Sequence, residues 1–141
     1  MKKSELKKIM IDFVKSYPFS NLITIGPNGF PKGRMMAHLP LGNDLAFWFA
    51  TSIKSNKIKE ITRNKSACVF VYRPTDHSSV KACGKAAIVK DAKTKKKYWK
   101  DEWKMFWSKG PADPDYVLIK VTPKSLEYLD YPNHKLEVLN A

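Results

Sequence analysis

Seven short apolar runs, each ending at a turn signal, constrain the fold of this chain more than any other feature. Runs of this length that are rich in β-branched and aromatic residues and bounded by Gly, Pro, Asn or Asp are typical of β-strands. Many short strands with few helices predict a mainly β fold, and we expect a small antiparallel barrel of six to seven strands, closed or partly closed, with short peripheral helices. The runs cover residues 21–25, 32–39, 45–50, 67–72, 80–89, 116–121 and 126–129.

The turn signals predict how these strands are connected. The first three strands are expected to form an antiparallel meander, with turns at residues 27–29 and 42–44. Gly84 lies inside the fifth run, which indicates a bulge or a close backbone approach. Residues 122–125 are expected to be a turn between the last two strands.

Three helices are expected at the connections. Amphipathic spacing predicts the first near the start of the chain, with Ser4 as its N-cap, and a second between Ser55 and Asn64. The third is a basic helix that Asp91 caps and that continues to about Trp107.

Length, hydropathy and cysteine placement limit the class of protein. The 141 residues are expected to form a single domain, residues 1–141. No apolar run approaches the roughly 20 residues of a membrane span, and the lysine-rich start lacks the apolar region of a signal peptide, so we expect a cytoplasmic protein without a membrane partner. Cys68 and Cys83 lie in strand-like runs and form no CxxC motif. This pattern favours buried structural thiols over a disulfide framework or a zinc site.

The basic charge of the chain has two interpretations. Its 26 Lys and Arg residues against 13 Asp and Glu give a net charge of +13, which raises a nucleic acid as a possible partner. Only three of the basic residues are arginines, although specific base and phosphate recognition depends on the arginine fork. We therefore interpret the lysines as a solvated surface with no specific nucleic-acid partner, and keep a basic nucleic-acid-binding barrel as an alternative.

Residues 33–61 carry the clearest indication of a ligand. Arg34 lies in a strand, Thr51 at the end of another, and Ser55 and Lys57 at the start of a helix. An arginine fork matches phosphate geometry, and a helix N-terminus presents free N–H groups and a positive dipole. The sequence therefore predicts a pocket for a phosphorylated cofactor.

Other chemistries find no support in the sequence. It contains no GxSxG, GxxxxGK[ST] or GxGxxG motif, and His38, His77 and His134 share no metal-ligand spacing, so we expect no metal and assign no catalytic residue. His38 could donate a hydrogen bond to a ligand, but a structural histidine is the favoured interpretation.

The order of these elements, and the residues within them, resemble the pyridoxamine phosphate oxidase-like flavoproteins with an FMN-binding split barrel, and among them the general stress protein branch. The resemblance covers nearly the whole chain. It rests on residues 28–31 before Arg34-Met35-Met36, the strand 45–51 before Ser55-Asn56-Lys57-Ile58, Gly84-Lys85-Ala86 followed by Asp91, and Gly110 with residues 113–116 before Val117-Leu118-Ile119.

The resemblance implies a split barrel and a homodimer with two FMN sites at the subunit interface. It implies that Arg34 and Lys57 bind the FMN phosphate with help from the hydroxyls of Thr51 and Ser55. It also implies that the backbone near the methionines after Arg34, and near the alanine before Thr51, passes the flavin. The expected cofactor-binding residues are Arg34, Met35, Met36, Ala50, Thr51, Ser55, Asn56, Lys57 and Trp107.

The aromatic and basic residues refine the expected activity. Trp48, Trp103 and Trp107 are candidates for flavin contact across the dimer, although aromatic residues at helical spacing usually pack in a core or interface. No arginine follows Arg73, so the substrate-phosphate site of the vitamin-making oxidases is lacking, and a tryptophan that is frequent in the general stress branch is replaced near Leu129. We expect an oxidoreductase that accepts electrons from NAD(P)H and passes them to an unidentified acceptor. A non-catalytic FMN carrier or flavin-sensing stress protein is the alternative.

Overall fold

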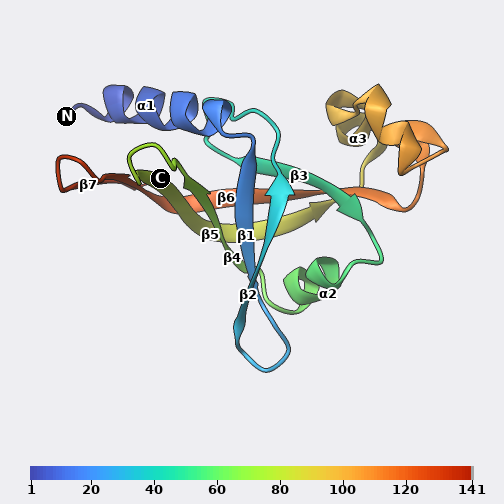
Figure 1. The fold of residues 1–141 in the computed structure, drawn as a ribbon. Helices are drawn as coiled ribbons and strands as arrows, with labels where there is room; N and C mark the ends of the chain where they lie inside the picture. The colour runs from blue at the N-terminus through green and yellow to red at the C-terminus, as the bar shows by residue number, and fades with distance from the viewer. Residues whose placement is uncertain (141) are drawn as a thin grey trace.

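The computed structural model describes residues 1–140 and contains one antiparallel sheet with short helices at its connections (Figure 1). The strands are β1 (Phe19–Ile25), β2 (Pro31–Ala37), β3 (Phe47–Ser52), β4 (Ser66–Tyr72), β5 (Ser79–Val89), β6 (Tyr116–Asp130) and β7 (Lys135–Asn140). The α-helices are α1 (Lys3–Ser16), α2 (Asn56–Arg63) and α3 (Ala92–Tyr98), and the 3-10 helices are η1 (Asp101–Met105) and η2 (Gly110–Ala112). The mainly β fold expected from the sequence is confirmed.

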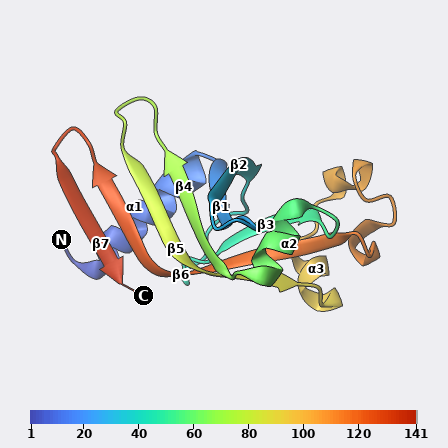
Figure 2. The ribbon, with the colours of Figure 1, turned by 90° about the horizontal axis from the view of Figure 1, so that it is seen from below.

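The sheet has the strand order β2-β1-β4-β5-β6-β3. Strand β6 pairs with β5 along one side, while its other side pairs first with β3 and then with β7. In Figure 2 strands β4 to β7 lie side by side, and the β4–β5 and β6–β7 turns project in the same direction. Strands β2 and β3 end the order, so each has an unpaired edge, and a hydrogen bond from Leu39 N to Trp48 O at 2.9 Å joins their neighbouring ends. We call this interruption between β2 and β3 the split of the barrel.

Alternating side chains fill the inside of the sheet. Leu22 of β1 and Phe49 of β3 are fully buried, as the period of two along a strand requires. Helix α1 lies against β5 and β7 and buries Met10, whereas α2 lies against β1 and β5 and buries Ile61. The two helices therefore cover opposite ends of the same core (Figure 1).

Two helix predictions need correction. Helix α1 begins at Lys3, and Ser4 is not its cap, because Lys2 takes the N-cap position without a side-chain hydrogen bond. Asp91 caps α3 as expected, accepting a hydrogen bond from Thr94 N at 3.0 Å. The helix predicted to reach Trp107 ends at Tyr98, and the short 3-10 helix η1 follows it. It ends there because the tryptophans that follow pack around Tyr116 of β6 instead of along one helical face.

The strand connections also differ from the prediction. Strand β3 pairs with β6 across the barrel and not with β2, so the first three strands form no meander. Residues 122–125 continue the single strand β6 instead of forming a turn. Gly84 makes this possible, because a Cβ there would collide with the carbonyl oxygen of Thr122, and the β5–β6 register shifts at this glycine. The expected bulge at Gly84 is therefore confirmed, whereas strand β7 was not predicted.

The prediction of buried free thiols is wrong. Cys68 of β4 and Cys83 of β5 form a disulfide with 4.1 Å between their Cα atoms, and both residues are half-buried. The pairing register explains this, because Cys68 and Cys83 stand directly opposite each other in the β4–β5 ladder.

None of the helices within residues 1–140 combines the length and hydrophobicity that crossing a bilayer requires.

Candidate functional site

Arg34 on β2 reaches across the barrel end to the buried carboxylate of Glu60 on α2. Its Nη2 donates to Glu60 Oε1 at 2.9 Å, and its Nη1 donates to Thr24 Oγ1 at 2.9 Å and to Leu22 O at 3.1 Å. The Thr24 hydroxyl donates to the same Glu60 oxygen at 2.9 Å. Arg34 is thus held in one position, with a quarter of its side chain exposed.

Lys57 meets two hydroxyl side chains at the start of α2. Its Nζ donates to Thr51 Oγ1 at 2.9 Å, and the Thr51 and Ser55 hydroxyl oxygens are 3.4 Å apart. Ser55 takes the N-cap position of α2, but its hydroxyl donates to Ser52 O at 2.8 Å instead of capping the helix. The structure therefore brings together Thr51, Ser55 and Lys57, as the sequence predicts.

Positive charge is in excess at this place. Burial is the main cause that lowers the pKa of Lys57, the positive charge of Arg34 lowers it further, and Glu60 opposes both. Lys32 Nζ also lies 4.0 Å from Glu60 Oε2. Within residues 1–140, Glu60 is the carboxylate that these three cations share. We call Arg34, Thr51, Ser55 and Lys57 the cation cluster; an anion would balance its charge.

A hollow of about 440 Å³ lies where β2 and β3 meet the residues around η1. Met36 is two residues from Arg34 on the same face of β2. Ala50 directly precedes Thr51, although their side chains point to opposite faces of β3. The backbones of β2 and β3 therefore connect this split hollow with the cation cluster. Its wall combines aromatic and apolar side chains with the charged Lys100 and Glu102. The aromatic part of this wall suits a planar ring system. The residues that line it include Met36, Ala50, Trp107, Phe19, Trp103 and Phe106.

Trp107 forms the inner wall of the split hollow. It is 8% exposed and packs on Tyr116 with 5.1 Å between ring centroids. Its indole N–H donates to Asp115 Oδ2 at 3.2 Å, while Asp115 Oδ1 accepts from Ser52 Oγ at 2.6 Å. The hydrogen bond from Ser52 is the main cause that lowers the pKa of Asp115. Asp115 therefore ties the tryptophan to the end of β3 and positions it.

His38 also borders the split hollow, but both of its ring nitrogens have partners. Nε2 lies 3.1 Å from Val14 O, and a carbonyl can only accept, so Nε2 carries the proton. Nδ1 then accepts from Ser20 Oγ at 2.9 Å. Burial lowers the pKa of His38. This geometry favours the structural interpretation of His38.

Three predicted side chains lie elsewhere. Met35 is 65% exposed on the opposite face of β2 and lines another hollow with Phe70, so only its backbone adjoins the split. Asn56 is exposed at the first position of α2, in a separate hollow of about 230 Å³. Trp48 packs on Tyr98 with 4.6 Å between ring centroids, outside the split hollow.

Sequence reasoning missed Glu60, Thr24 and Asp115, which hold the predicted residues in place. Glu60 follows Lys57 by three positions in α2, a spacing that puts both on one side of the helix and could have signalled it. Thr24 and Asp115 also contact residues that are distant in the sequence, Glu60 and Ser52 respectively, and for such contacts the local sequence carries no signal.

Comparisons with known proteins agree on one family. The family model described as "Pyridoxamine 5'-phosphate oxidase like" matches residues 5–140. The crystal structure of General Stress Protein 26 from Bacillus anthracis str. Sterne is 28% identical, with a TM-score of 0.82 over 97% of this chain and 99% of that chain. A Clostridium acetobutylicum protein related to general stress protein 26 is 21% identical, with a TM-score of 0.84 over 99% of this chain and 96% of that chain.

A third similar structure is that of a protein named for its ligand. A pyridoxamine 5'-phosphate oxidase-related, FMN binding protein from Nostoc punctiforme is 13% identical, with a TM-score of 0.73 over 100% of this chain and 97% of that chain. At these last two identities the likeness shows the fold alone. A search of curated proteins finds no significant match.

Proposed function

The chain belongs to the pyridoxamine 5'-phosphate oxidase-like family, and from that premise we propose that it binds FMN, with the phosphate at the cation cluster and the ring system in the split hollow. The observation that carries this proposal is the excess of positive charge around Glu60, where three cations share one carboxylate within residues 1–140. FMN is also named for the similar Nostoc punctiforme protein.

The donors of the cation cluster suit a phosphate monoester. Such a phosphate carries a charge near −2 at neutral pH and accepts hydrogen bonds at three oxygens. Thr51 accepts from Lys57, and because the Ser55 hydroxyl donates to Ser52 O, the Thr51 proton faces Ser55 Oγ at 3.4 Å, a long contact that a ligand oxygen can replace. Helix α2 spans eight residues, and the backbone N–H groups of its first turn add donors and positive dipole beside Lys57. Charge, donors and hydroxyls therefore fit the phosphate of FMN.

The split hollow provides the matching apolar part of the site. Met36 and Trp107 border it, and Asp115 fixes the orientation of the tryptophan. When bound, FMN supplies hydride and electron transfer itself, while the protein supplies binding, orientation and electrostatics. The side chains around the hollow need only hold the ring and exclude water.

We further propose that the protein is an oxidoreductase that takes electrons from NAD(P)H and passes them to an acceptor yet to be identified. The alternative is a flavin carrier or flavin-sensing stress protein without turnover. The FMN-loaded protein is mixed with NADH or NADPH and a range of acceptors, and oxidation of the nicotinamide is monitored as loss of absorbance at 340 nm. Turnover supports the oxidoreductase, and its absence with every acceptor supports the carrier or sensor. We place the protein in the cytoplasm, which cell fractionation tests.

The functional unit that we propose is a homodimer. Strand β3 needs no second copy to cover it, because Phe47 and Phe49 are fully buried within one chain. The exposed apolar side chains are instead Phe19, Met35 and Phe106, each more than 60% exposed near the split. Phe19 borders both the split hollow and the hollow on the other face of β2. A second copy that covers them would complete the site, and sedimentation at micromolar concentration should give twice the chain mass.

Titration of the apoprotein with FMN and riboflavin tests the binding proposal, because riboflavin lacks the phosphate. We expect clearly tighter binding of FMN, and equal affinities would refute the role of the cation cluster. The nucleic-acid alternative is tested with duplex DNA on the same preparation. We expect binding that is sequence-independent and steeply lost with salt, as for counterion release alone.

A further inference from the structure

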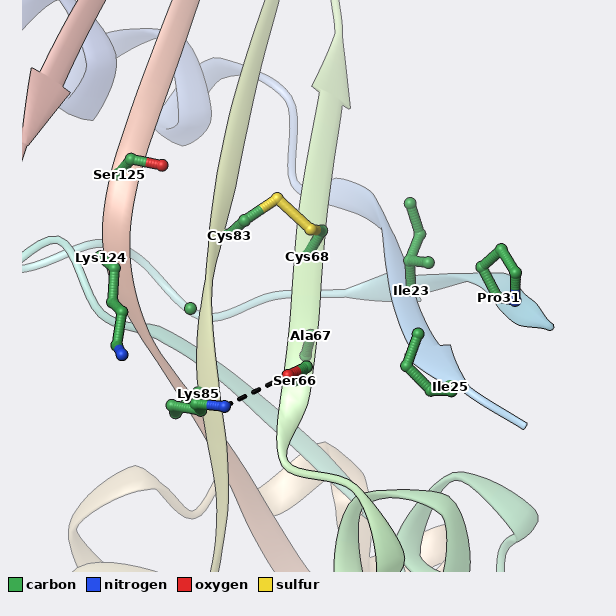
Figure 3. A pocket seen from close by; sticks show the side chains of 11 residues that line it. Ile23, Ile25, Pro31, Ser66, Ala67, Cys68, Cys83, Lys85, Lys124 and Ser125 are labelled. Carbon is green, nitrogen blue, oxygen red and sulfur yellow. Dashed lines mark hydrogen bonds between the residues drawn. A yellow bond between two sulfur atoms is a disulfide. The ribbon is translucent and has the colours of Figure 1, made fainter. Parts of the chain in front are cut away.

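The disulfide between Cys68 and Cys83 lies on the outer face of the sheet. The adjacent side chains Val69 and Ala82 are fully buried in the core, so the alternation along β4 and β5 turns both cysteines outward. The two half-buried residues form part of a hollow of about 470 Å³, the cysteine hollow (Figure 3). A sulfur pair in such a place can be reached by a small molecule.

The β4–β5 ladder holds both cysteines in place independently of their bond. Every residue from Ser66 to Tyr72 pairs in register with a residue of β5. The connecting turn is closed by Arg73, whose Nε and Nη2 donate to the two oxygens of Asp76 at 2.9 and 3.0 Å. The Cα separation of 4.1 Å between the cysteines is therefore expected to persist in the reduced state. Reduction and reoxidation need no rearrangement of the sheet.

The charge at the cysteine hollow is positive. Lys85 of β5 and Lys124 of β6 line it and are its ionisable side chains apart from the cysteines themselves. Lys85 Nζ donates to Ser66 Oγ at 3.2 Å, which holds it at the same hollow, two positions along the β4–β5 ladder from the disulfide (Figure 3). The nearby carboxylate Glu127 is paired with Lys81 at 2.7 Å. Cations next to a disulfide stabilise the leaving thiolate and attract an anionic thiol.

We propose that Cys68–Cys83 is a reversible thiol–disulfide site whose co-reactant is a small thiol that carries carboxylate groups. This inference goes beyond FMN binding and does not depend on it. The hollow accepts a molecule of the size of a short peptide, and its two lysines select for negative charge.

The reaction balances with two thiol molecules. The thiolate of the first attacks one cysteine Sγ, the Sγ–Sγ bond breaks, and its electron pair leaves on the other cysteine as a thiolate. A second thiol attacks the mixed disulfide, which releases the oxidised small-molecule disulfide and the second cysteine thiolate. The two cysteines take up the two protons that the reductant gives up, and two electrons have passed to the protein.

The test measures thiols on the native full-length protein. Incubation with 3-mercaptopropionate, an anionic thiol, should expose two titratable thiols per chain while the far-ultraviolet circular dichroism stays unchanged, and the corresponding small disulfide should remove them again. The Cys68→Ser/Cys83→Ser variant should expose none. Reduction only after denaturant is added would overturn the proposal, because the bond would then be inaccessible in the assembled protein.

The role of the lysines is tested with a cationic thiol of similar size, cysteamine. Removing one charge at roughly 8 Å in water changes each rate by about two- to threefold, in opposite directions for the anionic and the cationic thiol. The ratio of the anionic to the cationic rate should therefore fall in Lys85→Gln and in Lys124→Gln by about five- to sixfold each. Lys8→Gln, an exposed change on α1, is the matched control and should leave the ratio unchanged. An unchanged ratio in the double lysine variant would overturn the selectivity for an anionic thiol.

Discussion

Replacing Lys57 by glutamine should weaken FMN binding and leave riboflavin binding intact. Lys57 Nζ donates to Thr51 Oγ1 at 2.9 Å and lies half-buried beside the positive charge of Arg34. The substitution removes one cation of the cluster but leaves no carboxylate without a partner, because Arg34 stays 2.9 Å from Glu60. The fold should therefore tolerate the change.

The size of the effect follows from the lost contact. A hydrogen bond to a charged partner contributes about 1.5 to 3 kcal/mol, which is a rise in the FMN dissociation constant of about 13- to 160-fold at 1.36 kcal/mol per decade. Arg34→Ala should lose a similar affinity but also stability. It leaves the buried Glu60 with only the more distant Lys32 and Lys57, so the cost in unfolding free energy should stay below the about 3 to 5 kcal/mol of a buried charge without any partner.

The assay is a titration of each apoprotein by quenching of flavin fluorescence, with FMN and riboflavin side by side. Lys59→Gln is the matched control, because Lys59 is an exposed lysine of the same helix outside the cation cluster, and both affinities should be nearly unchanged. If Lys57→Gln weakens both flavins equally, or neither, the phosphate does not bind at this cluster.

Three further changes test the same geometry. Glu60→Gln should tighten FMN binding and leave riboflavin binding unchanged, because it removes the negative charge that competes with phosphate for Arg34; the same paired titration measures this. Above about pH 6, where the phosphate is a dianion, FMN affinity should be full below the pKa of Lys57 in the free protein and should decline as the pH rises through it, since the phosphate favours the protonated lysine. Because burial lowers that pKa from 10.5, the decline should begin below the ordinary lysine range and be absent in Lys57→Gln, with riboflavin titrations at each pH as the reference. Gly84→Ala should lower the unfolding free energy by about 1 to 3 kcal/mol, because a Cβ there collides with the β6 backbone; urea denaturation checks it.

The positions of the strands were predictable, but their partners were not. Each strand carries its own signal in alternating apolar residues, whereas pairing depends on how the barrel closes. Strand β3 follows β2 in the sequence and yet pairs with β6, so these two consecutive strands lie at opposite ends of the strand order. Residues 122–125 have the composition of a turn, but Gly84 on the neighbouring strand lets the backbone pass as a bulge.

The disulfide could have been predicted from the strand register beside the turn, although the apolar neighbours of the two cysteines indicated buried thiols. The polar turn of residues 73–78 separates the two strands, and a ladder closed directly beside it pairs Tyr72 with Ser79. Counting back along both strands then places Cys68 opposite Cys83. Assigning both cysteines to the core from their apolar neighbours concealed this register.

The candidate site was predictable where the residues are local in sequence. Thr51, Ser55 and Lys57 lie within one strand-to-helix connection, and the structure brings them together. Their supports were not predictable in the same way, because Asp115 joins Trp107 to the end of β3 across distant segments. The roles of all these residues toward FMN stay predictions.

The cofactor of the protein as purified tests the central claim most directly. The account predicts a yellow protein with the absorption bands of oxidised flavin, which releases FMN, and not riboflavin or FAD, when it is denatured. Reconstitution of the colourless apoprotein with FMN should restore the spectrum at one flavin per chain. A protein that purifies without flavin and whose apoprotein binds FMN no more tightly than riboflavin would contradict the account.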